Sequence, residues 1–213
     1  MRLAFAPLCA AFVLTGSACA SHGVPPPGAS AQAGPDWRTI ITDDDRGRLR
    51  NWRTAWTRAL TKAQASGHDQ EIAAEGALLD PDAAQSWQDP LPGLYRCRTI
   101  KLGAQSEGML DYVVYPAFDC RIRAEDGFVS FTKLSGSQRP IGLILSYSAN
   151  RMLFLGTLQL GDETRALEYG RDRERDLVAL VERIGAYRWR LVFPYPHFES
   201  TMDVIEVAPA PSQ

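Results

Sequence analysis

Apolar residues recur at helical spacing in the first half of the chain, between Thr42 and Gly67. Intervals of three and four residues predict one amphipathic helix over 42–67, with Thr42 as its N-cap and Gly67 as its stop. A second, shorter helix is predicted within 69–85 and ends near Pro81, because a proline disfavours the helical conformation of the preceding residue. The apolar stripe of the first helix consists of Leu49, Trp52, Trp56, Leu60 and Ala63.

From residue 93 onward, apolar residues alternate with polar ones, a period that is typical of β-strands. Stretches rich in Gly, Pro, Asn and Ser separate most of these runs and predict turns. Residues 174–185 fit the period of a short helix as well as that of a strand. The predicted strands are 93–102, 109–115, 118–124, 127–133, 140–147, 151–160, 177–184, 188–193 and 202–208.

Many short strands joined by tight turns favour antiparallel pairing, and such strands close most easily into a barrel. The predicted fold class is mainly β with a helical N-terminal part, an α+β arrangement. Its antiparallel, barrel-like or strongly bent sheet has about eight or nine strands, and one or two N-terminal helices cover it. A small barrel is either filled by side chains or keeps a cavity for a ligand, and the sequence leaves both open.

The first 20 residues have the pattern of an export signal. Arg2 supplies one positive charge, residues 3–14 are apolar, and small residues follow. Cleavage after Ala20 is one expected outcome, and the other is a lipoprotein in which Cys19 becomes the lipidated first residue. The apolar segment is too short to span a membrane. The sequence therefore predicts an exported, periplasmic protein whose only membrane contact is a lipid on Cys19, if that lipid is added.

Composition changes along the chain predict the domain boundaries. Residues 21–35 are uncharged and rich in Pro, Gly and Ala, so we expect a disordered tether. One globular domain is predicted over 36–208, with its helices in 42–85 and its strands in 93–208, before a disordered tail at 209–213. The net charge is −2, without a strongly basic segment. Nucleic acid is therefore not an expected partner, because phosphate binding requires a concentrated positive charge.

Cys97 and Cys120 each lie in an alternating run and are each followed by arginine. Each cysteine lies on the more apolar face of its predicted strand. A redox centre would need a C-x-x-C motif, and a zinc site would need further ligands at paired spacing. In an oxidising compartment, these two thiols are expected to form a structural disulfide.

The same two strands supply the candidate binding residues. Tyr95 is an aromatic residue near the start of the first strand, and four arginines point away from the cysteines. The arginines form either an anion-binding patch or an outer surface paired with acidic residues. They are Arg96, Arg98, Arg121 and Arg123.

No motif of a known catalytic or cofactor site is present, and neither a metal nor a cofactor is predicted. His197 has Glu199 and Ser200 close to it in sequence. A hydrolase would have to bring such groups together in space, so a site built on His197 is an alternative hypothesis and catalytic residues are not assigned.

Several segments together resemble a family of exported bacterial proteins known as domain of unknown function 4893. They include DWRTIITDDDRGRLRNWRTAW, YRCRTIKLG, YPAFDCRI, FTKLSGSQRPIG and RWRLVFPYPHFES. The resemblance implies a single domain from about Asp36 to Val207 in a Gram-negative envelope. It implies no activity, substrate or catalytic residue.

These observations favour a non-enzymatic envelope protein whose barrel-like domain binds a small apolar ligand or a protein partner. One alternative is a hydrolase-like enzyme that acts on an envelope component through His197. Another is a structural or assembly factor that docks through its N-terminal helix, where Trp52 and Trp56 form an exposed stripe. Burial of these two indoles against the sheet would remove the observation behind this last alternative.

Overall fold

The protein is described from a computed structural model, which covers residues 35–125 and 128–210. The predicted signal peptide, including Cys19, and nearly all of the predicted tether lie outside the described residues. Within the described part, each helix is too short or too polar to serve as a membrane-spanning segment.

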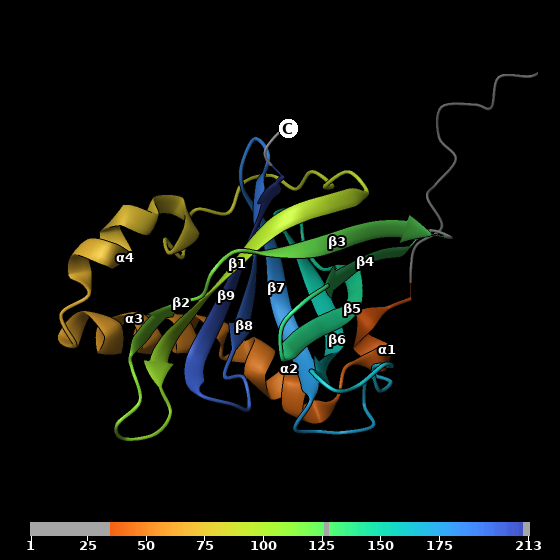
Figure 1. Cartoon of the computed structure of the whole chain (residues 1–213). Coiled ribbons are helices and arrows are strands. Elements are labelled where there is room, and N and C mark those ends of the chain that lie inside the picture. The colour runs from red at the N-terminus through yellow and green to blue at the C-terminus, as the bar shows by residue number, and fades with distance from the viewer. Residues whose placement is uncertain (1–34, 126–127, 211–213) are drawn as a thin grey trace, which may run out of the picture. The chain divides into compact units, whose positions relative to one another are not determined.

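Nine antiparallel strands form one continuous sheet (Figure 1). All nine predicted strands are present, and 174–185 contains a strand rather than a helix. The strands are β1 (Gly93–Ala104), β2 (Tyr112–Val114), β3 (Phe118–Glu125), β4 (Phe128–Lys133), β5 (Gln138–Ser146), β6 (Arg151–Leu160), β7 (Asp176–Gly185), β8 (Arg188–Pro194) and β9 (Ser200–Pro209).

Strand β1 closes the sheet into a barrel. One edge of β1 pairs with β2 and β3, and the other edge pairs with β9, where Cys97 lies opposite Val207. The result is a closed barrel of eight strands plus the extra strand β2. The predicted mainly β fold with a helical N-terminal part is thus confirmed. Strand β9 ends at Pro209, one residue beyond the predicted end of the domain.

Alternate residues of each strand point into the barrel and form its core. Three phenylalanines, one each from β4, β6 and β8, pack edge to face at the centre of this core. The ring centroids of Phe131 and Phe154 are 6.2 Å apart, and those of Phe154 and Phe193 are 5.7 Å apart. These rings are part of the buried core inside the barrel.

The disulfide between Cys97 and Cys120 lies in this interior core and confirms the predicted pairing. It joins β1 to β3, with 6.0 Å between the two Cα atoms and 23 residues of separation. Disulfides persist mainly in oxidising compartments, so this bond is consistent with an extracellular or periplasmic location.

We expect reduction of this disulfide to lower the free energy of unfolding by about 3 kcal/mol, because the bond restricts the unfolded chain. Urea denaturation with and without dithiothreitol measures the effect. The Cys97→Ala/Cys120→Ala variant is the control, since reductant should leave its midpoint unchanged. An unchanged midpoint in the reduced wild-type protein would contradict the expectation.

The helices cover one side of the barrel (Figure 1). α3 contacts β1, β8 and β9, and α2 contacts β7. Together they form a second core on the outer face of the barrel, separate from the interior core. The helical elements are α1 (Trp37–Ile40), α2 (Asp43–Arg50), α3 (Trp52–Ala65), α4 (Asp69–Glu75) and a 3₁₀ helix, η1 (Gly76–Leu78).

Two predicted helices differ from those observed. The single helix predicted over 42–67 is divided at Asn51, which has φ −99° and ψ 13° and whose side-chain amide donates to the Gly47 carbonyl. This local hydrogen bond competes with the helical pattern. The helix predicted within 69–85 ends earlier, because Gly76 adopts φ +53° at the end of α4. The short helix α1 was not expected from the sequence.

The tryptophan stripe of α3 packs within the chain. Trp56 is fully buried, and its Nε1 donates to the Leu79 carbonyl. Trp52 is half-buried, packs against the outer core and meets Trp56 edge to face. Burial of both indoles was the condition for setting aside docking through this helix; Trp56 meets this condition, whereas Trp52 is only half-buried.

Candidate functional site

A cavity of about 240 Å³ opens at one end of the barrel, where the β1–β2, β4–β5, β6–β7 and β8–β9 connections lie. This volume is slightly below the range of about 300–1,000 Å³ that is typical of sites for drug-sized ligands. The cavity therefore suits a smaller molecule.

One part of the cavity lining is apolar. Leu158, Leu177, Phe193 and Ile205 line the cavity and also belong to the interior core of the barrel. These side chains come from β6, β7, β8 and β9, so four strands fix this wall in place. An apolar part of a ligand would find a rigid surface there.

The other part of the lining contains charged and amide groups around Lys101. Lys101 lies on β1, two residues beyond Thr99, and like it points into the barrel. Its Nζ donates to Glu199 Oε2 at 2.5 Å and to Gln138 Oε1 at 3.2 Å, and Asp203 Oδ2 lies 3.7 Å away. Burial lowers the pKa of Lys101, but the carboxylates of Asp203 and Glu199 outweigh burial and raise it overall.

Asp203, on β9, is the most enclosed acid of this group. Burial raises its pKa, and the opposing influences are the charge of Lys101 and a hydrogen bond from the Ser200 hydroxyl. Asp203 therefore holds its proton at a higher pH than an exposed aspartate does. The cavity contains a carboxyl group that can donate as well as accept a proton.

Lys133, at the end of β4, is the second amine in the cavity lining. Its Nζ lies 4.3 Å from the centre of the Phe118 ring. Within the described ranges, none of the ion pairs involves Lys133, whereas Lys101 has two carboxylates close to it. Burial lowers the pKa of Lys133, and the charge of Lys101 lowers it further. Lys133 is thus the amine whose charge is not offset by a paired acid.

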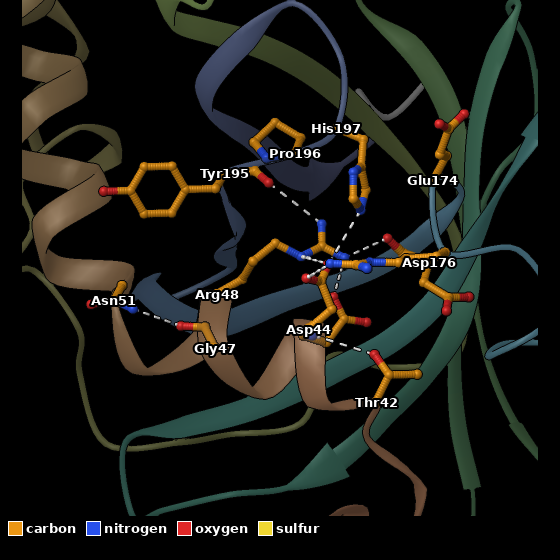
Figure 2. Close-up of polar contacts among 12 residues, drawn as sticks. Thr42, Asp44, Gly47, Arg48, Asn51, Glu174, Asp176, Tyr195, Pro196 and His197 are labelled. Carbon is orange, nitrogen blue, oxygen red and sulfur yellow. Dashed lines mark hydrogen bonds and ion pairs between the residues drawn. The ribbon is translucent and has the colours of Figure 1, made fainter.

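The β8–β9 connection (195–199) forms another wall of the cavity and is attached to α2 (Figure 2). Tyr195 and Glu199 both have positive φ, 47° and 71°, which is uncommon for residues with side chains. The guanidinium of Arg48 on α2 donates to the Tyr195 carbonyl at 3.5 Å and to the Asp176 carbonyl at 2.8 Å, and it is paired with Asp45. These contacts hold the connection against the barrel.

His197 lies in the middle of this connection and lines the cavity. Its Nε2 is buried and makes no hydrogen bond among the described residues. The nearest carboxylate oxygen is Asp44 Oδ2 on α2, which lies 3.6 Å away (Figure 2). Burial lowers the pKa of His197, and the charge of Arg48 lowers it further, whereas Asp44 acts in the opposite direction. The imidazole is therefore more often neutral near pH 7 than an exposed histidine is.

The family described as domain of unknown function (DUF4893) matches residues 37–207, which is most of the chain. The chain belongs to the DUF4893 family. This result confirms the resemblance seen in the sequence. No curated protein and no solved structure shows significant similarity to the chain. Since the family description names no activity, the function has to be inferred from the cavity.

The DUF4893 barrel places Tyr95 away from the cavity. Tyr95 is buried in the interior core, its hydroxyl donates to the Leu91 carbonyl at 2.6 Å, and its ring meets Trp189 edge to face. Burial raises the pKa of this hydroxyl. These contacts occupy Tyr95 within the fold.

The four candidate arginines lie on the outer face of β1 and β3. Arg96 pairs with Asp119 at 2.8 Å, and Arg98 bridges Glu75 at 2.6 Å and Glu206 at 2.8 Å. Arg121 and Arg123 occupy positions of β3 that alternate with the inward-facing Cys120 and Ile122. The pairing of Arg96 and Arg98 favours the interpretation of an acid-paired outer surface over that of a shared anion site.

Sequence reasoning missed both cavity amines of the DUF4893 domain. A signal for them is present in the composition: of the 23 lysine and arginine residues, 20 are arginine and only Lys62, Lys101 and Lys133 are lysine. Two of these three lysines line one cavity. Lysine differs from arginine in its compact head and in its readiness to lose a proton when buried. In the described ranges, no cluster of three or more His, Cys, Asp or Glu side chains is placed to hold a metal ion.

Proposed function

We propose that this protein is an exported bacterial binding protein that holds a small amphipathic molecule in the cavity. The observation that carries the proposal is the mixed lining: an apolar wall continuous with the barrel core, and charged and amide groups beside it. An apolar pocket with a few convergent polar groups is the usual form of a small-molecule site. The sequence led us to expect a small apolar ligand, and the mixed lining of the cavity favours an amphipathic ligand instead.

The charges of the cavity favour a ligand whose head group is an oxygen acceptor. Lys101 is already neutralised by Glu199 and Asp203, so it has little affinity left for a further anion. Lys133 lines the same cavity without a paired acid. A carboxylate or carbonyl oxygen at Lys133 would satisfy this amine, while the alkyl part of the ligand lies against Phe193 and Ile205.

Export rests on two independent features. The first 20 residues have the pattern of an export signal, whether cleavage follows Ala20 or Cys19 is lipidated. The Cys97–Cys120 disulfide is of a kind that persists outside the cytoplasm. A periplasmic location, where small nutrients and lipid fragments pass, suits a soluble binding barrel.

Three ligands that differ only in the head group test the proposal. We expect hexanoate to bind more tightly than hexanol, and hexanol more tightly than hexylamine, in calorimetric titrations of the mature protein. In Lys133→Met, the affinity for hexanoate should fall by about tenfold or more, because a hydrogen bond to a charged group contributes about 1.5–3 kcal/mol.

The matched control is Lys62→Met. It removes the same side chain and charge from α3, outside the cavity lining, and should leave hexanoate binding unchanged. Failure of all three ligands to bind, or equal binding of hexanoate to wild type and Lys133→Met, would reject the site.

Hydrolysis is the second candidate function. The observation in its favour is that His197 lines the cavity within 3.6 Å of the Asp44 carboxylate, and that Ser137 lines the same cavity. Among the described residues, however, His197 has no hydrogen bond to a hydroxyl. A hydrolase would turn over short-chain nitrophenyl esters, and Ser137→Ala and His197→Gln would both abolish that turnover. Turnover no faster than in buffer would eliminate this candidate.

A further inference from the structure

The uneven use of lysine and arginine raises a question about the chemistry of the cavity. A chain with 20 arginines holds only three lysines, and places Lys101 and Lys133 in one cavity. A site that needed only positive charge would be served by arginine, which also binds carboxylates with two parallel hydrogen bonds. What lysine can do and arginine cannot is lose its proton and act as a nucleophile.

The surroundings of Lys133 are those of an activated amine. A second lysine lines the same cavity. The Nζ of Lys133 is also 4.3 Å from the centre of the Phe118 ring, a contact that favours the protonated amine and thus acts against burial and Lys101. Lysine becomes nucleophilic when it is desolvated or lies near another cation. Both conditions hold here, and burial followed by the charge of Lys101 lowers the pKa of Lys133.

Lys101 lacks this property. Its Nζ contacts Glu199 at 2.5 Å and Asp203 at 3.7 Å, so its positive charge is stabilised, and its pKa is raised. Lys62, the third lysine, donates to the Ala104 carbonyl and pairs with Asp111 at 3.3 Å. Of the three lysines, Lys133 alone combines a cavity position with the absence of a paired acid among the described residues.

We propose that Lys133 forms a reversible imine with a small aldehyde or ketone bound in the cavity. The inference rests on the proposed function, because it states which reactive group the ligand in the cavity carries. The ligand class is a short alkyl carbonyl compound, whose oxygen approaches Lys133 while its alkyl part lies against the apolar wall.

The chemistry needs no partner beyond the carbonyl compound. The neutral amine of Lys133 donates its lone pair to the carbonyl carbon, the carbon–oxygen π bond breaks, and one proton passes from the nitrogen to the oxygen to give a carbinolamine. This intermediate loses its hydroxyl group as water, and the nitrogen loses its remaining proton, which leaves a carbon–nitrogen double bond. Asp203 lies in the same cavity, and its carboxyl group can carry the proton from the nitrogen to the departing oxygen.

Reductive trapping provides the test. The mature protein is incubated with butanal and cyanoborohydride at pH 7, which converts an imine into a stable alkylamine, and peptide mapping by mass spectrometry locates the product. Because the chain has only three lysines, each site and the N-terminal amine can be followed separately. We expect Lys133 to be alkylated faster than Lys62, because the lowered pKa of Lys133 increases its neutral fraction at pH 7, by about tenfold for each unit of pKa.

The pH dependence gives a second readout. Alkylation of Lys133 should increase with pH and level off at a lower pH than alkylation of a free lysine side chain, because a lowered pKa makes the neutral amine available at a lower pH. The charged groups around Lys133 are Lys101 on β1 and Arg139 on β5, which favour the neutral amine, and Asp203 on β9, which opposes them. Equal profiles for Lys133 and a free lysine side chain would overturn the inference.

Binding and trapping are measured separately, which distinguishes this inference from the proposed function. In Lys133→Arg, trapping at position 133 should be lost, because a guanidinium does not form an imine. Excess hexanoate should also slow trapping at Lys133 in the wild-type protein but not at Lys62. If hexanoate binds and Lys133 is alkylated no faster than Lys62, the imine inference fails alone. If Lys133 is alkylated rapidly but hexanoate does not bind, the acceptor-binding proposal fails instead.

Discussion

An Arg190→Met variant is expected to lose about 3–5 kcal/mol of its free energy of unfolding, because the substitution leaves a buried carboxylate without its main partner. Arg190 and Glu182 are both fully buried between the helices and the outer face of the barrel, and their nearest atoms are 2.6 Å apart. For a domain of this size, the loss corresponds to a fall of about 6–20 °C in the melting temperature.

Arg190 also connects the helical segment to the barrel. Its Nη1 donates to the carbonyl oxygens of Ala77, Leu78 and Asp80, and its guanidinium lies 4.5 Å from the centre of the Trp56 ring. These carbonyls belong to η1 and the irregular chain just after it, whereas other hydrogen bonds between this chain and the barrel lie further along, at residues 85–91. Without Arg190, these three carbonyls would lose a donor as well.

Arg151→Met is the matched control for this prediction. Arg151 contacts the same carboxylate, with its Nε 2.5 Å from Glu182 Oε1, but 26% of its side chain is exposed. We expect this variant to lose only about 1 kcal/mol, since water can replace a partly exposed partner. Thermal and urea denaturation of the two variants would measure the difference. Equal losses in the free energy of unfolding of the two variants would mean that burial of the arginine does not determine how much its ion pair with Glu182 contributes to stability.

The strands could be predicted from the sequence because alternation directly records which side chains point inward. The sequence left a closed barrel and a strongly bent sheet as alternatives, because closure depends on pairing between residues far apart in the chain, such as Cys97 and Val207. Periodicity describes single strands and does not identify their distant neighbours. The break at Asn51 was missed for a related reason: helical spacing continues through it, and only a side-chain hydrogen bond marks it.

The candidate site was only partly predictable. The disulfide between Cys97 and Cys120 was predicted correctly. The expected oxidising compartment, the spacing of the two cysteines and their positions on the apolar faces of their strands all favoured it. Lys101, Lys133 and Asp203 were missed, since each looks like an ordinary polar residue of a half-exposed strand until the barrel closes around them. Strict alternation from Cys97 through Thr99 places Lys101 on the inner face, and this is the signal that the sequence does contain. His197 was considered as a candidate from the sequence, but its contact with Asp44 was not predicted. Asp44 lies on α2, far from His197 in the sequence.

A Gly156→Ala variant is expected to lose at least about 3 kcal/mol of its free energy of unfolding, at the upper end of the usual cost of overpacking. Gly156 on β6 lies directly opposite Gly142 on β5. A Cβ atom at Gly156 would overlap the Ile141 carbonyl oxygen and would lie 2.6 Å from Phe154 Cζ and 2.8 Å from Gly142 Cα. Two of these neighbours are backbone atoms, which cannot move without separating the paired strands.

Gly47→Ala is the control, because it adds the same methyl group where space is free. No atom lies within 4 Å of the position that its Cβ would occupy in α2, and alanine favours a helix over glycine by about 1 kcal/mol. This variant should therefore be more stable than wild type in urea denaturation, whereas Gly156→Ala is less stable. If Gly156→Ala retained wild-type stability, β5 and β6 would have to tolerate separation at this point. The Phe154 ring, which packs against Phe131 and Phe193, could then shift at little cost, and the barrel core would be more deformable than its packing indicates.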